Sequence, residues 1–134
     1  MAEYRVTVKG FDSGLNELLS SQTRRYDKRT KRMVVCNPEK AKNDQLCLKA
    51  IWRDMHGVKL HTPIAIHYIF FVKDKKHDRM NIISAFDKSF QDALQTTKAL
   101  RNDGFDDVTI VTWEMYVDKA NPRVEVKIKE VEEK

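Results

Sequence analysis

The sequence lacks the features of a membrane protein or a secreted protein. Its longest apolar run covers residues 64–72, is interrupted by His67, and is far shorter than the ~20 residues that a membrane-spanning helix needs. The two cysteines, Cys36 and Cys47, show neither a disulfide framework nor a C-x-x-C spacing, and the first residues lack the apolar segment of a secretory signal. We therefore expect a reduced, cytoplasmic protein that contacts no membrane.

The chain has 134 residues, and we expect residues 1–134 to form a single domain whose core needs no disulfide or structural metal. Its basic excess is local, because residues 21–60 hold eleven basic and four acidic residues, a balance of +7 within a net charge of +5. Six basic residues crowd nine positions: Arg24, Arg25, Lys28, Arg29, Lys31 and Arg32. This cluster is typical of a phosphate-binding surface, although a solvated loop has the same composition.

The periodicity of apolar residues predicts four strands and two main helices. Alternation predicts short strands at residues 4–9 and 124–129, and residues 108–117 are also strand-like. Residues 64–72 are apolar on both faces, which predicts a central strand covered on both sides. Asn37 and Pro38 predict the start of a helix that Gly57 ends, with Cys47 in the core. An apolar stripe predicts a second helix over residues 81–100.

These elements predict an α+β fold with a mixed sheet of about four strands. The order along the chain is strand, basic arm, helix, strand, helix, strand, strand. Residues 11–37 show no sustained period, so we expect a long, basic arm there. The last two strands are separated by a short turn at Asn121 and Pro122, and we expect them to pair as an antiparallel hairpin.

Two acidic turns flank the second predicted helix, at residues 75–81 and 102–107. Turns at the ends of elements can hold polar side chains together while leaving them open to solvent. Carboxylate and amide oxygens are the ligands that Mg²⁺ prefers, so Asp78, Asn81 and Asp103 are candidate metal-site residues. The alternative is structural, because Asp and Asn also cap helices and form turns.

Lys88 and Asp92 lie four residues apart on the polar face of the same predicted helix. Lys88 also follows Asn81 by about two turns on that face. A cation beside a bound phosphate stabilises the charge that develops during hydrolysis. An ordinary surface ion pair explains the same spacing equally well.

Three blocks of the sequence stand in an order and spacing that resemble a known family. They are KKHDRMNI at residues 75–82, DKSFQDAL at 87–94 and NDGF at 102–105. The RusA family of Holliday junction resolvases is similar, with a basic lead-in to D-x-D-N, a helix bearing K-x-x-x-D-A/G-L, and a D/N-D turn. The similarity extends to GLNE at residues 14–17 and to VDKANPRVEV at 117–126, which resembles the C-terminal stretch of phage and prophage members.

The resemblance implies a homodimeric, Mg²⁺-dependent endonuclease that nicks four-way DNA junctions in paired, symmetric fashion during recombination and repair, with Mn²⁺ as a possible substitute. Asp78 and Asp103 match the metal-binding aspartates. Asn81, Lys88 and Asp92 match the asparagine, the helix lysine and the aspartate that follows it. Asp106 and Asp107 remain alternatives to Asp103. The six-residue basic cluster, together with Lys75 and Lys76, would hold phosphates of the junction arms.

Met80 departs from the family pattern, because it stands where the second aspartate of D-x-D-N is expected. A thioether is a soft ligand with no useful affinity for Mg²⁺. Either the remaining ligands suffice with water, or Asp92 or Asp106 contributes, or the protein binds junctions without cutting them efficiently.

Three functional hypotheses follow. The first is a junction-selective endonuclease. The second, which Met80 motivates, is a catalytically impaired or non-enzymatic protein of the same fold that binds junctions or other nucleic acids. The third is a structural or protein-binding α+β domain with no nucleic-acid partner, and it takes the structural alternative for every feature above.

Overall fold

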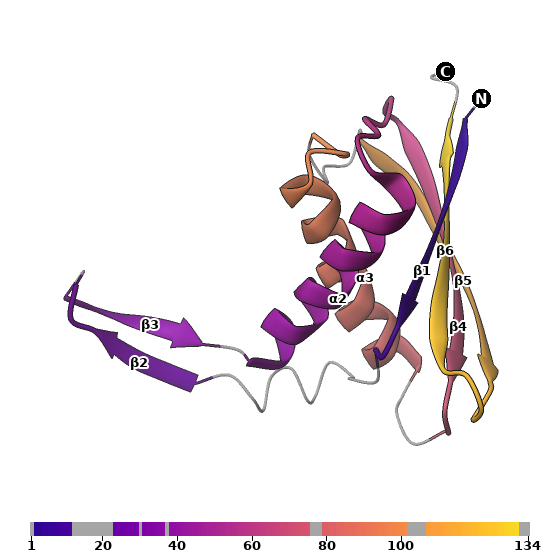
Figure 1. The fold of residues 1–134 in the computed structure, drawn as a ribbon. Helices are drawn as coiled ribbons and strands as arrows, with labels where there is room; N and C mark the ends of the chain where they lie inside the picture. Colours follow the sequence, from indigo (N-terminus) through magenta and orange to yellow (C-terminus); the bar gives the residue numbers. More distant parts are fainter. Residues whose placement is uncertain are drawn as a thin grey trace.

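The computed structural model describes residues 2–11, 23–29, 31–36, 38–75, 79–101 and 107–131. Within these ranges the chain forms two helices, a mixed four-stranded sheet and a separate two-stranded hairpin, which confirms the predicted α+β fold (Figure 1). The strands are β1 (Glu3–Lys9), β2 (Thr23–Asp27), β3 (Arg32–Cys36), β4 (Ile64–Val72), β5 (Val108–Val117) and β6 (Arg123–Glu130). The helices are α2 (Pro38–Met55) and α3 (Arg79–Thr96), and neither has an apolar stretch long enough to span a membrane.

The strand order of the large sheet is β1-β6-β4-β5. The expected hairpin of the last two strands is wrong, because β4 lies between β5 and β6. Strand β5 pairs with β4 in parallel, whereas β6 pairs antiparallel with both β1 and β4. A parallel pair needs a long crossover, and α3 supplies it between β4 and β5. The short turn after β5 therefore carries the chain past β4 rather than into an adjacent strand.

Both helices pack on one face of the large sheet, as Figure 1 shows. The core-facing side chains of β4 are buried: Ile64, Ile66, Tyr68 and Phe70. The side chains of β4 that point to the other face, such as His67 and Phe71, are only half-buried, so the prediction of a strand covered on both sides is wrong. Neighbouring side chains shield this open face instead, since the Arg123 guanidinium lies 3.8 Å from the Phe71 ring centroid and Tyr116 stacks on the same ring.

The two helices begin and pack as local signals predict. Helix α2 begins at Pro38 and ends at Met55, and Gly57 follows in the left-handed region with φ of 77°. Cys47 is fully buried on its apolar face, as predicted, and burial raises the pKa of its thiol to about 12. The apolar stripe of α3 is also buried, including Phe86 and Phe90. The helix ends at Thr96, four residues before the predicted end.

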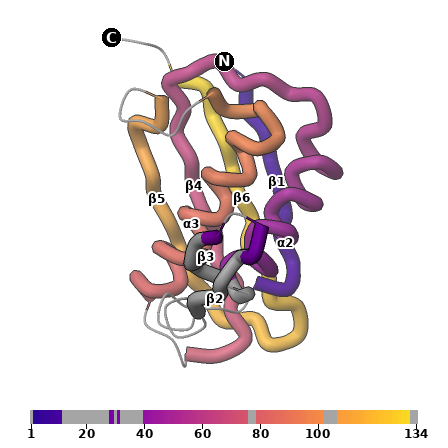
Figure 2. Tube along the Cα trace, turned by 90° about the vertical axis from the view of Figure 1, so that its left-hand side faces the viewer, coloured from indigo at the N-terminus to yellow at the C-terminus, as the bar shows by residue number. Residues whose placement is uncertain are grey.

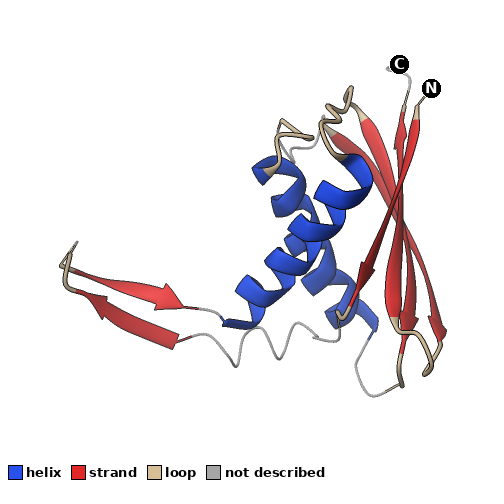
Figure 3. Ribbon diagram, viewed as in Figure 1, coloured by secondary structure: helices blue, strands red, loops and turns tan. Residues whose placement is uncertain are grey.

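The basic arm contains regular structure that its sequence did not indicate. Strands β2 and β3 form an antiparallel hairpin in which Thr23 is opposite Cys36 and Asp27 is opposite Arg32. Lys31 enters β3 with φ of 57°, the left-handed conformation that many hairpin connections require. Figure 3 shows this basic hairpin extending away from the helices and the large sheet. Because the hairpin does not lie on the large sheet or the helices, its sequence does not need the apolar alternation of a strand that packs on the core.

One edge of the large sheet, strand β1, is covered by the last turn of α2. The Thr7 backbone N–H donates to Oδ2 of Asp54 at 2.9 Å, and Nη2 of Arg53 donates to the Thr7 carbonyl at 2.5 Å. Arg53 also donates to both carboxylate oxygens of Asp54. Arg53 and Asp54 therefore hydrogen-bond to backbone groups of β1 that an exposed edge strand would present to another chain.

We expect Asp54→Asn to lower the free energy of unfolding by about 1 kcal/mol at pH 7, because it weakens charge-assisted hydrogen bonds. The hydrogen bond from Arg53 lowers the pKa of Asp54 in the folded state. The contribution is therefore present above the unfolded pKa of about 3.9 and is lost as pH falls through the lower folded pKa. Urea unfolding at neutral and acidic pH checks this. A difference between the two proteins that persists in acid would contradict it.

Candidate functional site

The basic hairpin carries all six residues of the predicted phosphate-binding cluster. Arg24 and Arg25 lie on β2, Arg32 lies on β3, and the connection contains Lys28, Arg29 and Lys31. The three residues of the connection are exposed. A two-stranded ribbon has the width of the DNA major groove, and basic side chains on it contact phosphates on either side. The hairpin thus has the shape and charge of a nucleic-acid-binding element.

Asp92 lies between the two helices and is held by two lysines. Nζ of Lys40 on α2 is 3.0 Å from Oδ2 of Asp92 and 2.8 Å from Oδ2 of Asp44. Nζ of Lys88 is 3.6 Å from the other carboxylate oxygen of Asp92, which confirms the predicted i,i+4 pair. Burial lowers the pKa of Lys40, but its hydrogen bonds to Asp44 and Asp92 outweigh this effect and the net shift is upward.

This arrangement favours a structural role for Asp92, because a carboxylate already neutralised by two cations is a poor additional ligand for Mg²⁺. Lys40 and Asp44 are the partners that the sequence did not reveal. Lys40 lies 52 positions from Asp92, and only the packing of α2 against α3 brings the two together.

Asn81 and Lys88 share one face of α3 but are not adjacent. They are seven positions apart, so their Cα atoms lie about 10.5 Å apart along the helix axis. Asn81 is half-buried in the first turn, whereas the Lys88 side chain is exposed over 64% of its surface. Lys88 therefore has the freedom to reach a phosphate that lies along the helix, at the cost of a weak surface ion pair.

Asp78, Asp103, Asp106 and Lys76 lie outside the described residues. Their described neighbours are nevertheless informative. Arg79 begins α3, whereas Arg101 and Asp107 follow its far end, and an 18-residue helix is about 27 Å long. The described residues beside Asp78 and those beside Asp103 thus lie at opposite ends of α3.

Asp107, the third candidate in the later acidic turn, is engaged in the fold. It is buried, its carbonyl accepts a 2.9 Å hydrogen bond from the Ile64 backbone N–H, and its carboxylate lies 3.4 Å from Nη2 of Arg101. These contacts fix the start of β4 beside the start of β5. Asp107 is therefore held in the fold by these contacts, and Asp103 and Asp106 remain the candidate ligands from that turn.

Among the described residues, no three His, Cys, Asp or Glu side chains cluster as a metal site would require. Asp87, which also lies on α3, accepts hydrogen bonds from the buried Tyr68 hydroxyl and from Gln91. Burial raises the pKa of Tyr68, which keeps this phenol protonated as a donor. The oxygen ligands that the sequence suggests, Asp78, Asn81 and Asp103 with Asp106 as an alternative to Asp103, have hard donor atoms that suit Mg²⁺.

An open groove of about 910 Å³ runs between the start of α3 and the C-terminal half of β5. Its walls combine charged and apolar side chains, with two basic residues and one acidic one: Val72, Asp74, Lys75, Arg79, Met80, Ile82, Trp113, Met115, Tyr116 and Val117. Lys75 was predicted as a phosphate contact, and the structure places it here. Trp113 and Arg79 were not predicted. The sequence contains no signal for them, because apolar residues on both faces of β5 are typical of a covered strand, whereas the structure leaves several of them exposed.

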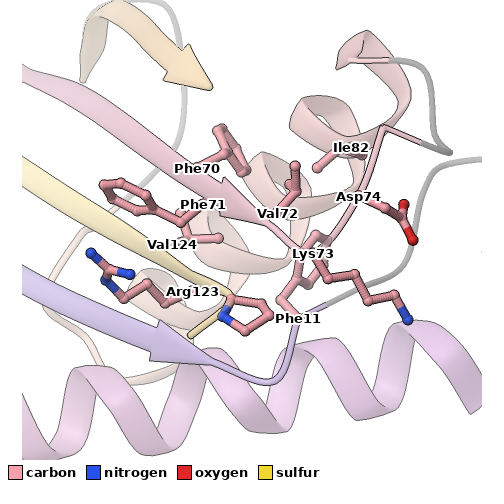
Figure 4. A pocket seen from close by; sticks show the side chains of 10 residues that line it. Phe11, Phe70, Phe71, Val72, Lys73, Asp74, Ile82, Arg123 and Val124 are labelled. Carbon is pink, nitrogen blue, oxygen red and sulfur yellow. The ribbon is translucent and has the colours of Figure 1, made fainter. Parts of the chain in front are cut away.

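A second cavity, at the end of β4, is too small to bind a substrate. It has a volume of about 30 Å³ and is closed by Phe11, Ile82 and the stem of Arg123, as Figure 4 shows. In liquid water, each molecule occupies a volume of about this size. Among the described residues, the larger hollows are therefore the groove beside α3 and a second one of about 280 Å³ between α2 and α3, beside Asp44 and Asp92.

Comparison with known proteins adds no family assignment. No protein-family model matches the chain, and a search of curated proteins finds no significant match.

Proposed function

We propose that the protein is a Mg²⁺-dependent endonuclease that nicks four-way DNA junctions in paired, symmetric fashion, acting as a homodimer in the cytoplasm. The observation that carries the proposal is the basic hairpin, which stands clear of the core and carries six basic residues. The resemblance of residues 75–82, 87–94 and 102–105 to the RusA family resolvases supplies the reaction.

The roles of the residues follow from their chemistry. Asp78 and Asp103 would hold Mg²⁺ with help from the Asn81 amide, and a bound Mg²⁺ polarises the scissile phosphate. Lys88 would neutralise charge on the phosphate during cleavage. The basic hairpin, with Lys75 and Lys76 from the segment that follows β4 in the sequence, would hold the junction arms through contacts that position the DNA without reading its sequence.

Substitutions in the basic hairpin test DNA binding separately from cleavage. Replacing Lys28, Arg29 and Lys31 with glutamine removes three exposed cations, and each lost phosphate contact reduces the slope of log K against log[salt] by about 0.9. We therefore expect weaker binding to a synthetic four-way junction and a salt slope smaller by about 2.7. Fluorescence anisotropy over a range of NaCl concentrations measures both quantities.

The matched control changes three exposed lysines outside the hairpin, Lys49, Lys59 and Lys129, to glutamine. The control removes the same net charge, so any loss of binding that it shows is a general electrostatic effect. If the control weakens binding as much as the hairpin variant does, the hairpin is not the DNA-binding element. A wild-type protein whose affinity is independent of salt would exclude phosphate contacts altogether.

Met80 favours one alternative function, a junction-binding protein of the same fold that does not cut. Its side chain is 56% exposed beside Arg79, where a metal ligand of the D-x-D-N motif would stand. Under this alternative the wild-type protein binds junctions without nicking them in Mg²⁺ or Mn²⁺, and Met80→Asp restores cleavage. Cleavage by the wild-type protein excludes it.

A further inference from the structure

The open face of the large sheet, which points away from both helices, carries a stack of two rings and a guanidinium group. The strand register places Arg123, Phe71 and Tyr116 side by side on β6, β4 and β5. The Arg123 guanidinium lies 3.8 Å from the centroid of the Phe71 ring, and the Tyr116 ring stacks on Phe71 with centroids 5.8 Å apart. Tyr116 lies on the edge strand and is 50% exposed, so the stack ends at a ring that is open to solvent.

The exposed ring of Tyr116 is held in place by a chain of hydrogen bonds. Its hydroxyl donates to Oε1 of Glu114 at 2.7 Å, and Oε2 of Glu114 lies 2.7 Å from Nε2 of His67. Nδ1 of His67 lies 2.6 Å from Oγ1 of Thr112. The bond to Glu114 raises the pKa of Tyr116, so the phenol stays protonated as a donor. An aromatic ring that is already ordered loses little freedom when a ligand stacks on it.

The side chains that surround this stack give the open face a positive balance. On β1 and β6, buried residues alternate with residues that point to the open face. Together with the single acidic residue of β5, these strands place five basic and three acidic residues there: Arg5, Lys9, Arg123, Lys127 and Lys129 against Glu3, Glu125 and Glu114. This balance favours an anionic ligand and disfavours the same face of a second copy.

Two exposed lysines lie at the end of the sheet that carries the stack. Lys9 is the last residue of β1 and is opposite Arg123, and Lys119 comes two residues after the end of β5. Figure 2 shows the order of the strands, with β5 and β1 at opposite sides of the sheet. Neighbouring strands are about 4.8 Å apart, so Lys9 lies about 14 Å from Tyr116 across the sheet. A stacked strand with about 3.4 Å per nucleotide spans this distance with about four nucleotides.

We propose that Tyr116 stacks an unpaired base of a single-stranded nucleic acid, and that Lys9 and Lys119 bind phosphates of the same strand. Aromatic side chains on the surface of a sheet bind unpaired bases in this way, and neighbouring cations hold the backbone. The bases of a duplex are already stacked on one another and offer no free face. The site goes beyond the proposed function, because it requires neither a metal ion nor cleavage.

Replacing Tyr116 with isoleucine removes the ring and keeps a residue that is common in strands. Stacking of one base is typically worth 1–3 kcal/mol, so we expect at least about fivefold weaker binding to a fluorescein-labelled thymidine 12-mer. The comparison ligand is an abasic strand of the same length, which has the phosphates but no bases. The wild type should bind it more weakly than the 12-mer, and Tyr116→Ile should bind it as the wild type does. Equal wild-type affinity for the two strands would overturn the proposal.

Two control variants separate the ring from its surroundings. Tyr116→Phe keeps the ring and loses the bond to Glu114, and it should bind the 12-mer within about threefold of wild type. Trp52→Ile removes an aromatic side chain that is 62% exposed on α2, and it should bind as the wild type does. If Trp52→Ile weakens binding as much as Tyr116→Ile does, the open face is not the stacking site.

The lysines are tested by the salt dependence of binding. For a single strand, each lost phosphate contact reduces the slope of log K against log[salt] by about 0.7. The double variant Lys9→Gln, Lys119→Gln should therefore bind the 12-mer with a slope smaller by about 1.4. An unchanged slope would overturn the two phosphate contacts.

Photo-cross-linking tests the site in the wild-type protein, so it does not depend on the folding of a variant. A 12-mer with one 5-iododeoxyuridine is irradiated with the protein, and the linked peptide is identified by mass spectrometry. We expect the link at Tyr116. A link confined to the basic hairpin or to α2 would contradict the proposal.

The outcomes distinguish this site from the proposed nuclease. A protein that links the 12-mer at Tyr116 but nicks no junction would leave the site standing and refute the nuclease. A protein that nicks junctions while Tyr116→Ile binds the 12-mer as the wild type does would refute the site alone. If Tyr116→Ile instead converts a dimer into a monomer by light scattering and binds the 12-mer normally, the open face binds a second copy and the proposal is wrong.

Discussion

Asp78→Asn is expected to reduce Mg²⁺-dependent nicking of a four-way junction by at least about 100-fold, because the loss of even an outer-shell partner of a metal ligand typically costs 10- to 100-fold. The neutral amide keeps the size of the side chain but loses the charge that attracts a hard cation. Binding to the junction should change little if the hairpin carries the phosphate contacts, as proposed. Gel analysis of an end-labelled junction, with anisotropy on the same samples, separates the two effects.

Asp118→Asn is the matched control for this variant. Asp118 follows β5 and is held by Arg123 and by the backbone N–H groups of Ala120 and Asn121, and the hydrogen bond from Arg123 lowers its pKa. The substitution removes one carboxylate without touching a proposed ligand. It should leave nicking within about threefold of wild type, in line with the small effects of surface changes. Unimpaired cleavage by Asp78→Asn would show that the ligand assignment is wrong.

Phe86→Ala is expected to lower the free energy of unfolding by about 3–5 kcal/mol, a large part of the total stability of a small domain. Phe86 is fully buried on α3 at the centre of an aromatic cluster. Its ring centroid lies 5.0 Å from that of Phe11, 5.4 Å from Tyr68 and 5.6 Å from Phe70. The cluster holds α3 against β4 through the contacts of Phe86 with Tyr68 and Phe70.

Urea unfolding measures this effect, and Trp52→Ala provides the comparison. Trp52 is a larger aromatic side chain, but it is 62% exposed and contacts His56 on its own helix. We expect its replacement to cost less than about 0.5 kcal/mol. A cost for Phe86→Ala similar to that for Trp52→Ala would mean that α3 does not pack on β4 as described.

The sequence predicts those elements whose signals lie within a few neighbouring residues. The start of α2 at Pro38 and the buried stripe of α3 follow from capping chemistry and from a period of 3.6 residues. The pairing of β5 and β6 was predicted wrongly because the length of a connection does not decide which strands pair. Residues 108–117 were correctly predicted as a strand. The sequence did not show that this strand is an exposed edge of the sheet.

In the candidate site, too, contacts within one element were predictable from the sequence, whereas contacts between distant elements were not. The Lys88–Asp92 pair was predictable because it lies within one helix. The contact of Lys40 with Asp92, which gives that carboxylate a structural role, depends on tertiary packing across 52 positions. The hairpin escaped prediction because β2 and β3 lie away from the large sheet and the helices and carry no apolar alternation, although the sequence did group its basic residues as one cluster.

Cleavage of a synthetic four-way junction by the wild-type protein tests the central claim most directly. The junction is labelled at the 5′ end of each strand in turn and is incubated with Mg²⁺, with a linear duplex of the same sequence as the control. The account predicts nicks at symmetric positions on two opposing strands and none on the duplex. Salt-dependent binding to the junction without a nick on any strand, in Mg²⁺ and in Mn²⁺, would contradict it.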